Sequence, residues 1–208
     1  MEQAKHIGIP VDINEIANRI HAECVKAGWW DDYPNKVHRY NTAMVLVCTE
    51  ICESVEHYRR DTKSYQSPDK HLPHRRGAVV ELADALIRLL DMGAALGVVF
   101  RTADILDDIR VFQKETADFE VAMASRGFRV EVNTMDFYAY ALGVTTGAKS
   151  HRAGQSRIIQ DSVAAVLYLA LWLGENDLFT IVEEKFAYNQ TRKDHKPENR
   201  AKEGGKKL

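Results

Sequence analysis

The sequence lacks the features that mark several large classes of protein. It has three cysteines in 208 residues, an odd and sparse number that suits a reducing compartment better than a disulfide framework. Its formal net charge of -2 leaves no global field that would favour nucleic acid or an anionic membrane as a partner. Residues 1–10 lack the apolar region of a signal peptide, and no stretch is long and apolar enough to span a bilayer. These absences predict a soluble cytoplasmic protein with no membrane partner.

Strand signals are also scarce, since only Phe128–Val132 alternates apolar and polar residues, over a short run. Helical periodicity dominates instead, and 45% of the residues are hydrophobic, enough to bury the core of one domain over residues 1–208. The predicted fold class is all-α. The expected helices are Asn14–Lys26, Thr42–Arg60, Ala78–Leu96, Thr102–Ala124, Asp136–Thr145, Arg157–Leu173 and Leu178–Tyr188.

Two acidic pairs lie inside apolar helical segments: Glu50 with Glu53, and Glu81 with Asp84. Side chains at i and i+3 project from the same helical face, so two antiparallel helices can present all four acids to one point. Carboxylates are almost never buried without a partner for their charge. The pattern therefore predicts a site for a hard divalent cation, Mg²⁺ or alternatively Mn²⁺.

A simpler interpretation is that the acids form salt bridges on helix surfaces. Asp84 has Arg88 four residues further on, and Glu56 has Arg60 at the same spacing, which favours ion pairs within a helix. Either acidic pair taken alone favours this interpretation. The doubled pattern inside apolar helices favours a metal.

The doubled motif resembles that of the MazG-like all-α nucleoside triphosphate pyrophosphohydrolases, in which E-x-x-E is followed on the next helix by E-x-x-D. Segments 27–30, 71–75 and 185–207 resemble the phage and bacterial enzymes of this group, most closely the purine dNTP diphosphohydrolases. The resemblance covers residues 15–97 and 177–208. It implies a MazG-like helical bundle in which residues 98–176 form an additional helical insertion between the third helix and the C-terminal helix.

The resemblance implies Mg²⁺-dependent hydrolysis of nucleoside triphosphates, with purine dNTPs (dGTP or dATP) as the expected substrates and a monophosphate and pyrophosphate as products. Glu50, Glu53, Glu81 and Asp84 would hold the metal, and Glu53 would also accept the proton as the catalytic base. The resemblance further implies a homo-oligomer, a dimer or a tetramer, with no stable nucleic-acid partner. A phage-encoded protein would work in the host cytoplasm.

Supporting residues follow from the same resemblance. If the tail folds over the site, its basic and polar side chains would bind phosphate, Arg75 would add a contact near the third helix, and Trp30 would stack on the base. The alternatives are a solvated or nucleic-acid-binding tail, a surface turn, and a tryptophan that packs on the core. The tail candidates are Lys185, Asn189, Arg192, Lys193 and His195.

The sequence is also compatible with other functions. The enzyme alternatives are a house-cleaning pyrophosphatase and one specific for dUTP or dCTP, and the alternative from another class is a helical interaction protein with a basic nucleic-acid-binding tail. For the enzyme, changing Glu53 to Gln or Asp84 to Asn is expected to abolish turnover. Because either change would relieve repulsion among the acids, the metal-free protein is expected to keep or gain stability.

Overall fold

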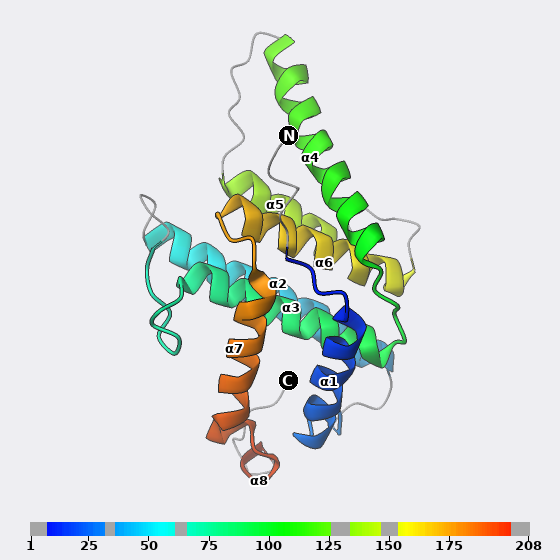
Figure 1. Ribbon diagram of the computed structural model, residues 1–208, viewed down its shortest axis with the longest axis vertical. Helices are drawn as coiled ribbons and strands as arrows, with labels where there is room; N and C mark the ends of the chain where they lie inside the picture. The colour runs from blue at the N-terminus through cyan, green and yellow to red at the C-terminus, as the bar shows by residue number, and fades with distance from the viewer. Residues whose placement is uncertain (1–7, 32–35, 61–65, 126–133, 147–153, 201–208) are drawn as a thin grey trace.

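The computed structural model describes residues 8–31, 36–60, 66–125, 134–146 and 154–200, and it is all-helical, as predicted (Figure 1). Within these ranges there is no β-strand, only an isolated bridge between Pro68 and Arg76. The short alternating run Phe128–Val132 lies outside them. The helices are α1 (Ile13–Lys26), α2 (Lys36–Arg60), α3 (Gly77–Ala95), α4 (Thr102–Ser125), α5 (Thr134–Thr145), α6 (Gln155–Trp172), α7 (Leu178–Thr191), the 3-10 helix η2 (Lys193–His195) and α8 (Pro197–Arg200).

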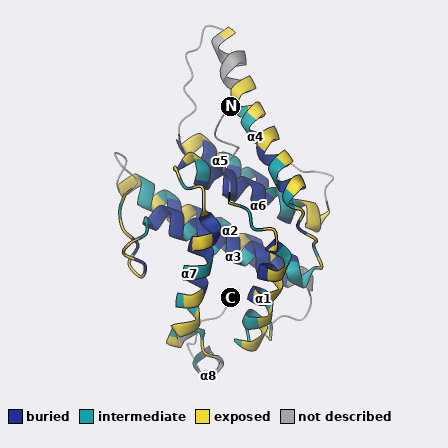
Figure 2. Ribbon diagram, viewed as in Figure 1, coloured by how far each residue is buried: buried dark blue, intermediate teal, exposed yellow. Residues whose placement is uncertain are grey.

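Helix α3 is the centre of the molecule. Its residues are apolar on nearly every face, and such a helix is stable only when neighbours cover it on every side. It contacts α1, α2, α6 and α7, and most of its side chains are buried, with Leu82, Leu86, Leu89 and Leu90 fully so (Figure 2). The acids of the second predicted pair are therefore carried by the most buried helix of the fold.

The segment predicted as an insertion folds into α4, α5 and α6. Helix α6 packs against α3, α4 and α5, while α5 also contacts α2. A buried polar contact joins the two parts, because the Ser54 hydroxyl donates to the carbonyl of Ala78 at 2.7 Å and lies 2.7 Å from the Tyr138 hydroxyl. The same hydrophobic core runs through both parts.

Helices α1 and α7 both extend away from the α2–α3 pair, on the side opposite α4, α5 and α6 (Figure 1). Asp177 caps α7 by accepting a hydrogen bond from the amide of Thr180, and an ion pair between Arg19 and Glu183 joins the two helices. None of the described helices combines the length and apolar character needed to cross a membrane. Side chains of α1, α2, α3 and α7, that of Asp84 among them, line a cavity.

Candidate metal and ligand site

Three of the four predicted acids come together where α2 packs against α3. One carboxylate oxygen from each of Glu50, Glu53 and Glu81 lies within 4.8 Å of the other two. Helix α2 presents Glu50 and Glu53 together, because residues three apart lie on one face, and α3 adds Glu81. Three oxygens at this separation can coordinate one hard divalent cation.

Glu50 is the most buried of these acids and is held by an arginine from α3. Arg88 donates to Glu50 Oε1 from its Nε at 2.7 Å, and a second guanidinium nitrogen lies 2.6 Å from the same oxygen. Burial raises the pKa of Glu50, with Arg88 opposing the rise and the charge of Asp84 adding to it. Arg88 thus pairs across the helix interface, and not with Asp84 on its own helix as the surface salt-bridge interpretation expected.

Glu81 is a largely buried acid among the other carboxylates of the site. Burial raises its pKa to about 8; Lys185 opposes the rise, and the charges of Asp84, Glu50 and Glu53 add to it. The Nε2 atom of His57 is 3.7 Å from Glu81 Oε1, but burial of that ring lowers the pKa of His57. Lys185 is paired with Asp84 and offsets the burial of Glu81 only in part, so a further cation at this interface would be favoured.

The fourth acid, Asp84, turns toward α7. Its Oδ2 lies 3.0 Å from the ammonium of Lys185, and its Oδ1 accepts a hydrogen bond from Asn189 Nδ2 at 3.1 Å. Only 4% of the Lys185 side chain is exposed. Burial opposes the charge of this lysine, but Asp84 and Glu81 raise its pKa overall. Lys185 and Asn189, predicted as phosphate contacts, therefore bind an acid of the motif and hold α7 against α3.

The orientation of the Asn189 amide follows from this contact. An ionised carboxylate only accepts hydrogen bonds, so the NH₂ group of Asn189 must face Asp84. The Oδ1 atom is left buried, with no hydrogen-bond partner in the described part of the chain. Asn189 therefore offers an acceptor to a donor on a ligand, whereas phosphate oxygens, which are acceptors themselves, do not match it.

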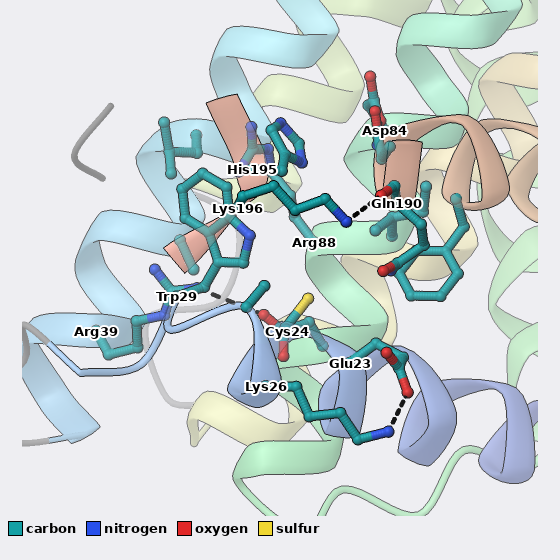
Figure 3. Close-up of a pocket in the computed structure, with 17 residues that line it drawn as sticks. Glu23, Cys24, Lys26, Trp29, Arg39, Asp84, Arg88, Gln190, His195 and Lys196 are labelled. Atoms are coloured by element: carbon teal, nitrogen blue, oxygen red, sulfur yellow. Dashed lines mark hydrogen bonds and ion pairs between the residues drawn. The ribbon is translucent and has the colours of Figure 1, made fainter. Parts of the chain in front are cut away.

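A cavity of about 260 Å³ lies beside the acids, bounded by α1, α2, α3, α7 and the segment after α7 (Figure 3). Asp84 and Arg88 belong both to its wall and to the surroundings of the glutamate cluster. Trp29 and Phe186 contribute aromatic surface to the lining. The acids thus adjoin a hollow with charged and aromatic walls, a combination typical of small-molecule sites.

The wall of the cavity also contains Asp91, a buried acid that the sequence interpretation did not identify. Its Oδ1 lies 2.7 Å from His21 Nδ1 and accepts from Trp30 Nε1 at 3.1 Å, and its Oδ2 accepts from Arg39 at 3.4 Å. Asp91 stands seven residues after Asp84, on the same face of α3. That spacing was the signal that could have found it.

The two tryptophans have different surroundings. Trp30, predicted to stack on a base, is committed to Asp91, with the Arg39 guanidinium 4.7 Å from its ring centroid. Trp29 lines the cavity and meets the ring of His195 edge-on, with 5.1 Å between ring centroids. Trp29 is therefore the tryptophan that a ligand in this cavity would contact.

The remaining predicted contacts differ in whether they line the cavity. His195 lines the cavity, whereas Arg192 and Lys193 do not belong to its wall. Arg75 donates to Glu184 from two nitrogens, at 2.9 and 2.5 Å, and this pairing is the main cause that lowers the pKa of Glu184 to about 2. Arg75 thus ties the start of α3 to α7, away from the cavity.

Comparisons of the chain with protein-family models, curated proteins and solved structures find no match. The all-helical class is shown by the structure, while membership of the MazG-like group stays a prediction from the motif.

Proposed function

We propose that this protein is a Mg²⁺-dependent hydrolase that converts nucleoside triphosphates, with purine dNTPs as its substrates, to the monophosphate and pyrophosphate. The observation that carries the proposal is the cluster of Glu50, Glu53 and Glu81 within 4.8 Å, next to a cavity with cationic and aromatic walls. Polyphosphate substrates need a hard cation and positive side chains together. The preference for purines comes from the sequence resemblance.

The three glutamates fit a magnesium ion chemically. All donors are carboxylate oxygens, and the raised pKa of Glu81, about 8, reflects burial among other acids that the charge of Lys185 offsets only in part. Bound Mg²⁺ would polarise phosphoryl oxygens and lower the pKa of a bound water. Asp84 would contribute to the site indirectly, because its ion pair with Lys185 holds α7 against α3.

The side chains around the cluster would divide the remaining work. Glu53 is the exposed acid of the cluster, and its carboxylate would take the proton from the attacking water. Arg88 would keep Glu50 oriented through its two short contacts. Trp29 would cover one face of the base or sugar, excluding water from that side of the cavity.

Incubation with each canonical and modified dNTP and Mg²⁺, followed by separation of monophosphate and pyrophosphate, tests the proposal. Wild-type protein is expected to turn over purine dNTPs fastest, and Glu50→Gln and Glu53→Gln to lose turnover. Glu56→Gln is the matched control, because Glu56 lies on the same helix, half exposed and paired with Arg59.

Faster turnover of damaged nucleotides, dUTP or dCTP would identify one of the other pyrophosphatases. If no nucleotide is turned over, and Mg²⁺ with nucleotide leaves the unfolding midpoint unchanged, the result would favour the hypothesis of a helical interaction protein.

A further inference from the structure

The cations around the cavity differ in whether a carboxylate neutralises them. Arg88 is paired with Glu50, Arg39 with Asp91, and Lys26 with Glu23. Such pairs have little charge left to offer a ligand. The lining also contains Lys196, whose ammonium has no carboxylate partner among the described residues.

The Lys196 ammonium makes one neutral contact, donating to the backbone carbonyl of Gln190 at 3.2 Å. An ammonium group carries three N–H donors, so two donors and the whole positive charge remain available. Figure 3 shows the side chain extending between Trp29 and Gln190, with its nitrogen toward the end of α7. A free cation therefore projects where a ligand in the cavity would lie.

The turn after α7 places this side chain. The amide of His195 donates to the carbonyl of Arg192 and that of Lys196 to the carbonyl of Lys193, each at 3.2 Å, while Asn199 Nδ2 donates to the latter carbonyl at 2.8 Å. These bonds fold the chain back toward α1, where the His195 ring meets Trp29. The turn directs Lys196 to the cavity, and Lys193, three residues earlier, is exposed and does not line it.

We infer that Lys196 binds a phosphoryl group of a metal-chelated polyphosphate seated in this cavity. The ligand class follows from the two charges that the ligand must satisfy. A bare anion would be repelled by Glu50, Glu53 and Glu81, whereas a polyphosphate carrying a divalent cation presents the cation to the acids and an oxygen to Lys196. The inference rests on the proposed function and adds a contact that the motif does not contain.

Calorimetric titration with Mg²⁺-tripolyphosphate and with the Mg²⁺ complexes of α,β-imido dNTPs tests this role. Lys196→Met is expected to weaken binding of both probes about tenfold, since a hydrogen bond to a charged group contributes about 1.5–3 kcal/mol and 1.4 kcal/mol is tenfold. Lys193→Met, the matched control with the same charge change in the same segment, should bind within about twofold of wild type. Lys196→Arg should recover most of the affinity. The salt dependence of binding should become shallower in Lys196→Met alone.

The outcomes separate the two proposals. If wild type binds the probes and Lys196→Met binds them as tightly as Lys193→Met does, the role of Lys196 is wrong and the proposed function stands. If wild type binds neither probe, both are wrong. Thermal melts of the metal-free variants, expected to match wild type because Lys196 is exposed, ensure that lost binding is not lost folding.

Discussion

Replacing Glu81 with Gln is expected to stabilise the metal-free protein at alkaline pH. The pKa of Glu81 is about 8 in the folded state, against an ordinary value of 4.5. Between these values the folded protein holds a proton that the unfolded chain has lost. Wild-type stability is therefore fully present below about pH 4.5 and is lost as pH rises through about 8. Glutamine mimics the protonated acid and does not titrate, so the variant keeps that stability.

The size of the effect follows from the same shift. One pKa unit is worth 1.36 kcal/mol, so the rise in the pKa of Glu81 from 4.5 to about 8 corresponds to about 5 kcal/mol. The side chain is 13% exposed, and contact with water reduces the expected gain to about 3 kcal/mol at pH 9. For a chain of 208 residues this is a rise of about 6–12 °C in melting temperature.

Urea unfolding in EDTA at pH 5, 7 and 9 measures the difference directly. The two proteins should be close in stability at pH 5 and diverge as pH rises. Saturating Mg²⁺ should then reverse the order at pH 9, because the ion stabilises only the state that binds it.

Glu56→Gln is the control, since Glu56 is half exposed, and its free energy of unfolding should stay within about 0.5 kcal/mol of wild type at each pH. The reasoning fails if Glu81→Gln is no more stable than wild type at pH 9 in EDTA, or if both proteins lose stability with the same slope.

Three further substitutions test the packing around the site, each by urea unfolding in EDTA at pH 7. Asp84→Asn should cost about 3 kcal/mol, because it removes the carboxylate that pairs directly with the buried Lys185 ammonium; a neutral or stabilising result would support the expectation from sequence instead. Gly77→Ala should cost about 1–3 kcal/mol, since the new Cβ would lie 2.2 Å from the His57 ring, and His57→Ala in the same chain should recover most of it; an unaltered single variant would contradict this close approach. Asp91→Asn should cost about 2 kcal/mol and alter tryptophan fluorescence, because its carboxylate accepts a hydrogen bond from the indole of Trp30, and an unchanged spectrum would argue against that contact.

The all-α fold and the approximate helix ranges were predictable because helix formation follows local periodicity. The third helix was predicted at Ala78–Leu96 and is observed at Gly77–Ala95, and the last long helix was predicted at Leu178–Tyr188 and is observed at Leu178–Thr191. The second helix begins at Lys36, earlier than the predicted Thr42. A helix start depends on capping and on tertiary contacts as much as on periodicity.

The sequence alone determined which acids share a helix face, because a spacing of three residues gives Glu50 and Glu53, or Glu81 and Asp84, the same direction in any α-helix. Only the tertiary structure decided the partners of these acids. Arg88 lies 38 residues from Glu50 in the chain and Lys185 lies far beyond Asp84, yet both pairs form because α2 and α7 both pack against α3. Charge pairing across helices depends on where the backbones are brought together. For that reason the motif identified the acids, and the fold assigned three of them to a shared cluster and the fourth to α7.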